Sequence, residues 1–120
     1  MEEIVRDYFE SWIKKDVNVL EAIFAEDIVY IECYGPEYRG IDQVRRWFTE
    51  WNKSGTVLIW NIKRLLHCGS TVVAEWYFRY CYDGKEGEFD GVSVIEFDNN
   101  GKIIKLCEYK AESNHYHPFG

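Results

Sequence analysis

The sequence predicts a single α+β domain in which a curved sheet folds around a small-molecule pocket. Apolar side chains recur at three- and four-residue steps near the N-terminus, which is typical of amphipathic helices. Apolar and polar side chains alternate through most of the second half, and turn sequences interrupt the alternation, which is typical of hairpins. Helices followed by hairpin-connected strands indicate α+β rather than a doubly wound α/β domain.

Three helices and one strand are predicted before residue 55. Apolar periodicity and N-capping aspartates place the helices at about residues 2–15, 17–24 and 42–54. The β-rich run at residues 27–33 predicts a strand, and the glycines and proline at residues 35–40 predict a loop.

Four strands are predicted after residue 55, at residues 56–68, 71–82, 86–98 and 102–111. Asp83-Gly84 between the second and third of them is a strong hairpin signal. Residues 112–120 form a C-terminal tail that either frays or docks on the surface. Its apolar side chains favour docking over the edge of the sheet, and they are Tyr116, Pro118 and Phe119.

Length and charge restrict the class of protein. A chain of 120 residues fits one domain, residues 1–120, and an aromatic content of 18% is enough to line a cavity as well as a core. The net charge of −7 argues against nucleic acid and anionic membranes as partners, because both require clustered Lys and Arg. The cysteines form no CxxC pair, and we find neither a signal peptide nor a long apolar stretch. We therefore expect reduced cysteines and a cytoplasmic location.

Strand alternation leaves two interpretations of the faces of the sheet. In residues 71–82, side chains of opposite character alternate, with Glu75, Tyr77 and Arg79 in one row and Trp76, Phe78 and Tyr80 in the other. Alternation alone favours the aromatic row as the core and the charged row as a solvated face. In the alternative, the charged row lines a cavity and the aromatic row packs against a second subunit.

Several short motifs occur in an order and spacing that resemble a known superfamily. They are Tyr8-x15-Phe24-Ala-Glu-Asp27, Tyr30-Ile-Glu32, Tyr38-Arg-Gly40, Gly101-Lys-Ile103 and Glu108-Tyr109. Together they cover about residues 4–111 and resemble the nuclear transport factor 2-like superfamily. Within it, the chain is most similar to the SnoaL-like group, relatives of ketosteroid isomerase. The resemblance implies a cone-shaped, curved antiparallel sheet with three N-terminal helices closing a pocket.

The resemblance also favours the second interpretation of the faces. It implies a homodimer formed through the outer face of the sheet, with Trp76, Phe78 and Tyr80 in the interface. It implies that Ser93, Leu106 and the charged row point into the cone. The ligand-binding residues predicted on this basis are Trp47, Trp60, Arg64, Glu75, Tyr77, Arg79, Glu108 and Lys110.

Three catalytic positions follow from the isomerase branch of the family. There, a tyrosine on the first helix helps hold a developing oxyanion, a carboxylate on the first strand shuttles the proton, and a protonated aspartate is the second oxyanion donor. The matching residues are Tyr8, Glu32 and Ser93. A serine hydroxyl can donate a hydrogen bond but has no carboxylic-acid proton, so a literal steroid isomerase is not predicted.

These residues lead to a hypothesis of cofactor-independent acid/base chemistry of the isomerase, cyclase or dehydratase class. Glu32 is the expected base, and Arg64 and Arg79 are expected to hold a small polar or anionic substrate. No metal or organic cofactor is required, and His115-x-His117 has no third ligand nearby, so no metal site is predicted. Two alternatives stay open: a non-catalytic ligand-binding protein, and a dimeric interaction module with a filled pocket.

Overall fold

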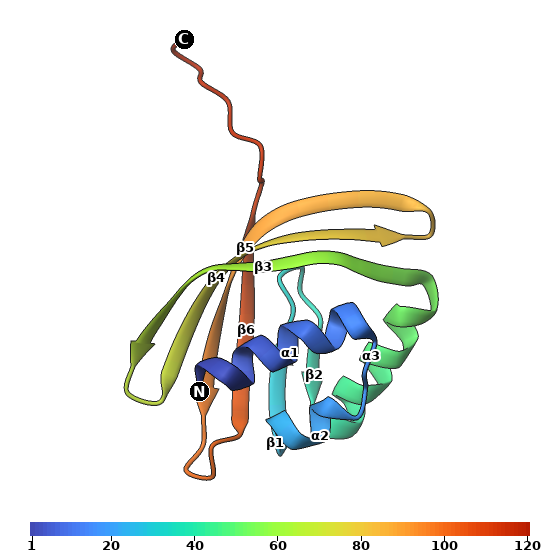
Figure 1. The fold of residues 1–120 in the computed structure, drawn as a ribbon, viewed down its shortest axis with the longest axis vertical. Coiled ribbons are helices and arrows are strands. Elements are labelled where there is room, and N and C mark those ends of the chain that lie inside the picture. The colour runs from blue at the N-terminus through green and yellow to red at the C-terminus, as the bar shows by residue number, and fades with distance from the viewer.

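Three helices and a single curved sheet of six strands make up the computed structural model, which describes residues 1–120 (Figure 1). The helices are α1 (Glu2–Lys14), α2 (Val19–Ile23) and α3 (Ile41–Ser54). The strands are β1 (Phe24–Ile31), β2 (Glu37–Arg39), β3 (Gly55–Cys68), β4 (Thr71–Tyr82), β5 (Lys85–Phe97) and β6 (Ile103–Ala111). None of the helices combines the length and the apolarity needed to cross a bilayer.

The strand order across the sheet is β2-β1-β6-β5-β4-β3. The strands β3 to β6 are consecutive antiparallel neighbours, as their tight turns predicted. β1 departs from this pattern because it pairs in parallel with β6, and β2 pairs with it on the other side. This arrangement brings the end of β1 beside the second half of β6, where the candidate site lies.

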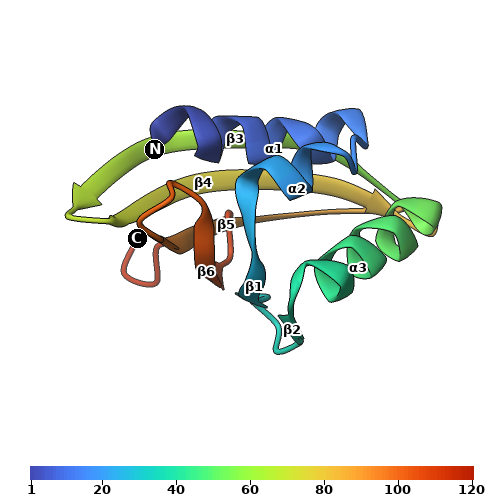
Figure 2. The ribbon, with the colours of Figure 1, turned by 90° about the horizontal axis from the view of Figure 1, so that it is seen from below.

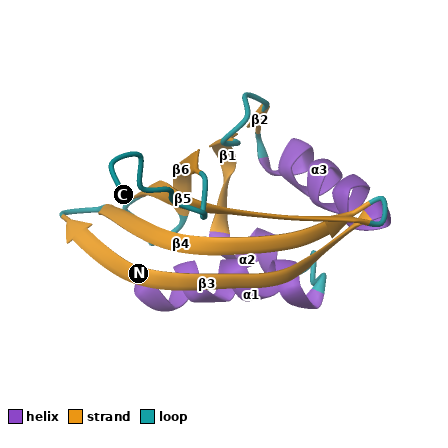
Figure 3. Cartoon of the chain, turned by 90° about the horizontal axis from the view of Figure 1, so that it is seen from above, coloured by secondary structure: helices purple, strands orange, loops and turns teal.

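The long strands are bowed along their length, and two register shifts contribute to the bend. Figures 2 and 3 show α1 running beside β3, and α3 at the end where β3 begins and β4 turns into β5. β3 carries one extra residue relative to β4 between Val57 and Ile59, and another between Ile62 and Arg64. Such bulges increase the local twist and exchange the two faces of a strand.

Buried aromatic side chains connect α1 to the sheet. The buried face of α1 carries Val5, Tyr8, Phe9 and Trp12, at the three- and four-residue steps that predicted the helix. The ring of Phe9 stacks on Trp60 of β3 with 4.0 Å between the ring centroids. This contact fixes α1 over the sheet and so fixes the position of Tyr8 and Trp12.

Apolar side chains fill the part of the cone that lies away from the β4–β5 turn. They include Leu20, Ile23, Val72, Ile95, Phe97, Ile103 and Leu106, all buried. The other end, between α3 and the β4–β5 turn, is not filled. The sheet thus has a packed end that stabilises the fold and an open end that forms a cavity.

The predicted α+β class and curved sheet are confirmed, with differences in detail. β1 begins at Phe24, directly after α2, and ends before the predicted boundary. β2 was predicted as loop, because three residues next to Pro36 are too few for a readable alternation.

The predicted docking of the C-terminal tail is wrong. Figure 1 shows the tail leaving the body of the protein, and Phe119 is fully exposed. The contact beside the start of the tail is polar: Asp90 of β5 is ion-paired with Lys63 and accepts a hydrogen bond of 3.1 Å from the Ser113 hydroxyl. Beyond this contact the rings of Tyr116 and Phe119 are exposed.

Candidate functional site

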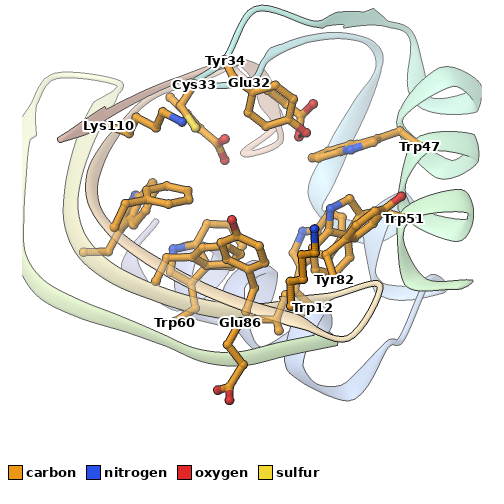
Figure 4. A pocket seen from close by; sticks show the side chains of 17 residues that line it. Trp12, Glu32, Cys33, Tyr34, Trp47, Trp51, Trp60, Tyr82, Glu86 and Lys110 are labelled. Atoms are coloured by element: carbon orange, nitrogen blue, oxygen red, sulfur yellow. Dashed lines mark hydrogen bonds between the residues drawn. The ribbon is translucent and has the colours of Figure 1, made fainter. Parts of the chain in front are cut away.

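A cavity of about 540 Å³ occupies the open end of the cone (Figure 4). Its walls are mainly apolar, and all five tryptophans of the chain contribute to them. The lining residues are Trp12, Glu32, Cys33, Tyr34, Trp47, Trp51, Val57, Trp60, Trp76, Phe78, Tyr80, Tyr82, Lys85, Glu86, Phe89, Glu108 and Lys110. Figure 4 shows Glu32, Cys33 and Lys110 on one side of the cavity, with Trp47 and Trp51 of α3 on another.

Glycines in β5 make room for the aromatic wall. Trp76 pairs with Gly91 across the β4–β5 ladder, and Tyr80 pairs with Gly87. A Cβ atom on Gly91 would overlap the six-membered ring of Trp76, and one on Gly87 would overlap the ring of Tyr80. Both rings therefore lie over backbone that carries no side chain, and in this position they form part of the cavity wall.

Glu108 of β6 lies at the end of a buried chain of hydrogen bonds. The indole N–H of Trp12 donates to the Tyr8 hydroxyl over 2.9 Å, and the Tyr8 hydroxyl donates to the Tyr30 hydroxyl over 2.7 Å. The Tyr30 hydroxyl in turn donates to the Glu108 carboxylate. Since each group donates toward Glu108, the chain orients the carboxylate and supports its ionised form.

Burial nevertheless raises the pKa of Glu108 to about 8. The hydrogen bond from Tyr30 and the backbone N–H of Cys33 lower this pKa, whereas the charge of Glu32 raises it. A carboxyl group that titrates near neutrality can both accept and return a proton under physiological conditions. Glu108 therefore has the protonation behaviour of an acid/base group.

Glu32 is the second buried carboxylate, and it lies just beyond the end of β1. Its two oxygens accept hydrogen bonds of 2.9 Å from the Tyr34 and Tyr38 hydroxyls, one each. Burial raises the pKa of Glu32, while these two donors and the nearby indole N–H of Trp47 lower it. The site thus holds two carboxyl groups in different surroundings, which is a common arrangement in acid/base enzymes.

Some polar groups of the cavity have no partner within the protein. The indole nitrogens of Trp47 and Trp60 are buried without a hydrogen bond that meets normal geometry. Buried N–H groups are usually paired, so unpaired ones in a cavity wall are available to a ligand or to water. The Cys33 thiol also faces the cavity, where burial raises its pKa to about 11, so it is protonated at neutral pH.

Four residues predicted to point into the cone lie outside it. Arg64, Glu75, Tyr77 and Arg79 are absent from the cavity wall. Arg64 pairs with Glu75 at 3.4 Å on the outer face, and Arg79 pairs at 3.0 Å with Glu86, a residue of the cavity mouth whose carboxylate points away from the cavity in Figure 4. The bulge before Arg64 moves it to the outer face. The β4 charges stay outside because burying them without partners would cost several kcal/mol or more.

The two faces of β4 are the reverse of those that the resemblance implied. Trp76, Phe78 and Tyr80 line the inside of the cone, so their assignment to the outer face is wrong. Trp76 is 1% exposed. A homodimer remains a prediction, but these three residues cannot form its interface from the cavity wall. The first interpretation of the strand faces, which followed from alternation alone, is the correct one for β4.

Of the other seven predicted site residues, five line the cavity and two are buried behind its wall. Trp47, Trp60, Glu32, Glu108 and Lys110 line the cavity together, and their roles in binding or catalysis remain predictions.

Tyr8 and Ser93 are fully buried behind the cavity wall. Tyr8 acts on the site through Tyr30, whereas the Ser93 hydroxyl accepts a hydrogen bond of 2.9 Å from the indole of Trp76. Ser93 therefore positions an aromatic wall and has no contact with the cavity.

Sequence reasoning gave no role to the tyrosines that hold the two carboxylates. Tyr30 could have been found, since it lies two residues before Glu32 and shares its face of the strand. Tyr34 and Tyr38 flank the turn at Gly35, which no periodicity describes. The role of Trp12 was not predicted, because its hydrogen bond to Tyr8 depends on side-chain direction.

The curved sheet, the helices and the enclosed cavity define the ketosteroid isomerase-like class of cone-shaped α+β domains. Residues 5–106 match the SnoaL-like domain model, and the chain belongs to that family. The resemblance seen in the motifs is thereby confirmed. Among curated protein sequences, none matches this chain.

Solved structures of the same fold come from several bacteria. A hypothetical protein with a ketosteroid isomerase-like fold from Catenulispora acidiphila, in complex with trimethylamine, is 19% identical, with a TM-score of 0.81 and coverage of 92% of this chain and 86% of that one. An epoxide hydrolase from Mycobacterium tuberculosis is 18% identical, with a TM-score of 0.81 and coverage of 91% and 80%. A Mesorhizobium loti protein provisionally assigned to the SnoaL-like polyketide cyclases is 22% identical, with a TM-score of 0.72 and coverage of 90% and 97%. Identities this low establish a shared fold and leave the chemistry to the site.

Proposed function

We propose that this protein is a cofactor-independent enzyme that moves a proton at a carbon next to a carbonyl group, as in isomerisation, cyclisation or dehydration. Glu108 is the group that accepts and returns the proton, and Glu32 is the second carboxylate of the site. The observation that carries the proposal is a buried carboxyl group of pKa about 8 on the wall of a largely aromatic cavity.

The surroundings of Glu108 suit this role. The donor chain from Trp12 through Tyr8 and Tyr30 keeps the carboxyl group oriented while it changes protonation state. The aromatic walls exclude water, which strengthens electrostatic interactions with a reacting carbonyl oxygen. The unpaired indole N–H groups of Trp47 and Trp60 are further donors within the same cavity wall. Tyr8 and Tyr30 are positioning residues in this scheme, because they act through Glu108.

Exchange of carbon-bound hydrogen for deuterium tests the proposal without knowledge of the natural substrate. Aryl and cyclic ketones of differing charge are incubated with the protein in D2O, and loss of the α-proton signals is followed by NMR. We expect at least one ketone to exchange faster than in buffer, and Glu108→Gln to slow that exchange by ~100-fold or more. Glu32→Gln is expected to lower the rate as well, because it removes the neighbouring charge that raises the pKa of Glu108.

Glu75→Gln is the matched control, since it removes a carboxylate from the outer face of the sheet. It is expected to exchange ketones at the wild-type rate. Exchange that stays at the buffer rate for every ketone, or that survives in Glu108→Gln, would contradict the proposal.

Ligand binding without catalysis is the second candidate function. The complex of the Catenulispora acidiphila relative with trimethylamine supports a pocket of this fold that accommodates a small organic molecule. A protein that binds a cavity-sized ligand but exchanges no α-proton would belong to this second class.

A further inference from the structure

We propose that the cavity binds an organic cation, such as an amine or a quaternary ammonium group, between its aromatic walls and its two buried carboxylates. This inference deepens the proposed function by naming the charge of the molecule that the site takes. It rests on the proposed function in one respect, since both require Glu32 and Glu108 to face the ligand.

The two buried carboxyl groups have no cationic partner within the protein. Glu32 is 6% exposed and Glu108 is 9% exposed, yet neither takes part in any ion pair of the protein. Their side-chain hydrogen-bond donors are all neutral: tyrosine hydroxyls for both and, near Glu32, the indole N–H of Trp47. Buried carboxylates are normally paired with a cation or held neutral. In the free protein the raised pKa keeps Glu108 neutral at pH 7, and a cationic ligand would supply the partner that lets it ionise beside Glu32.

The aromatic rings of the cavity walls are suited to binding a cation. Indole and phenol rings attract cations through their faces, and cages of such rings are a recurrent way of binding quaternary ammonium groups. One cation already takes up such a position in this cavity: the Lys110 ammonium nitrogen lies 5.3 Å from the ring centroid of Phe89 and 5.9 Å from that of Tyr34. Lys110 makes no ion pair with a carboxylate. The walls therefore accept a positive charge without a salt bridge.

The placement of the arginines argues against an anionic ligand. Arg64 and Arg79 lie outside the cavity wall, each paired with a carboxylate. The cavity itself has only lysines as cations, Lys85 and Lys110, and both are exposed. An anion placed deep in the cavity would meet the Glu32 carboxyl group and would oppose ionisation of Glu108, with no guanidinium group in the wall to offset either effect.

Binding of a cation has a consequence for the proton on Glu108. The groups that face this carboxyl group are Tyr8 of α1, Tyr30 of β1, Glu32 and Cys33 after β1, Tyr38 of β2 and Lys110 of β6. With a pKa of about 8, Glu108 holds its proton at pH 7 in the free protein. A nearby positive charge favours the carboxylate, so the proton passes to solvent as the cation binds. The cationic ligand thereby converts Glu108 from an acid into a base.

Isothermal titration calorimetry with choline tests the inference. Its neutral isostere, 3,3-dimethylbutan-1-ol, has carbon in place of nitrogen and isolates the effect of charge. We expect choline to bind ~10-fold or more tightly than the isostere at neutral pH, the advantage that several cation–π contacts and two carboxylates supply. Addition of choline to the protein in weakly buffered, amine-free solution, followed with a pH electrode, should show release of up to one proton per choline bound.

Variants separate the contributions of the walls and the charges. Glu108→Gln is expected to abolish proton release and to weaken choline binding by ~10-fold, whereas Glu75→Gln on the outer face should change neither. Trp47→Leu should weaken choline binding more than binding of the isostere, because it removes a ring face. Lys110→Met should strengthen choline binding, since it removes a competing positive charge; an anion site would respond in the opposite direction.

Equal or tighter binding of the isostere, binding without proton release, or binding of neither compound would overturn the inference. The outcome is independent of the exchange assay. Ketone exchange without choline binding would contradict the cation site but not the proposed proton transfer. Choline binding without ketone exchange would contradict the proposed proton transfer but not the cation site. Melting of Glu108→Gln at mildly acidic pH shows that the variant is folded before it is titrated.

Discussion

Raising the pH from about 5 to about 9 is expected to lower the melting temperature of the protein by roughly 10 °C, and Glu108→Gln is expected to remove most of that loss. The reason is the protonation of one buried carboxyl group. Its pKa is 4.5 under ordinary conditions and about 8 in the folded protein. Between these two values, the folded protein holds a proton that the unfolded chain has lost.

The direction of the effect follows from this difference. A rising pH favours the state that binds fewer protons, which here is the unfolded chain. Stability from this group is therefore fully present below about pH 4.5 and is lost as the pH rises through about 8. Each pKa unit corresponds to about 1.4 kcal/mol, so we expect a loss of ~3 kcal/mol or more in the free energy of unfolding. Glu32, whose pKa burial also raises, adds to the loss in the same direction.

Thermal melts followed by circular dichroism across this pH range provide the measurement. Glu75→Gln, which removes a carboxylate from the outer surface, should follow the wild-type profile. Glu108→Gln should melt at nearly constant temperature over the upper half of the range and should exceed the wild type at high pH. A wild-type melting temperature that rises from pH 5 to pH 9, or a Glu108→Gln profile parallel to it, would show that Glu108 is ionised throughout.

Gly91→Ala is expected to destabilise the protein by about 3 kcal/mol, although it adds a single methyl group. Its Cβ would overlap the six-membered ring of Trp76, which is 1% exposed and is held by the Ser93 hydroxyl over 2.9 Å. The ring cannot move without breaking that hydrogen bond and displacing neighbouring aromatic rings. Chemical denaturation of the variant and the wild type measures the difference.

A second substitution identifies the cause of this loss. In a Trp76→Leu background the ring is absent, so Gly91→Ala should cost ~1 kcal/mol or less, a coupling of about 2 kcal/mol between the two sites. Gly87→Ala should cost less than Gly91→Ala in the wild type, since the Tyr80 ring that it meets is only partly buried and can shift. Equal costs for Gly91→Ala in both backgrounds would mean that the ring does not lie over Gly91.

Local sequence patterns predicted the elements of this fold more accurately than the faces of its strands. The buried stripe of α1 and the hairpin at Asp83-Gly84 depend on neighbouring residues alone, and both were found. The inside of β3 depends on two bulges, which alternation along a single strand does not reveal. Arg64 therefore lies on the opposite face from the one predicted.

The candidate site was predicted in part. Glu32 and Glu108 were named through the family resemblance, and both line the cavity. The inward direction of Trp76 depends on Gly91, a residue of the neighbouring strand, and so required knowledge of strand register. The tyrosines that donate to the carboxylates were not predicted, because their hydrogen bonds cross between elements that are distant in sequence.

Carbon-13 NMR of the glutamate side-chain carboxyl groups, titrated against pH, tests the central claim most directly. The protein should show one glutamate carboxyl signal that titrates with a pKa of about 8, and this signal should be missing from Glu108→Gln. Tyr30→Phe should raise that pKa further, because it removes the hydrogen bond that stabilises the carboxylate. If the signal assigned to Glu108 instead titrates near 4.5, the carboxyl group is ionised at neutral pH, and the proposed acid/base site and its protonation switch are both contradicted.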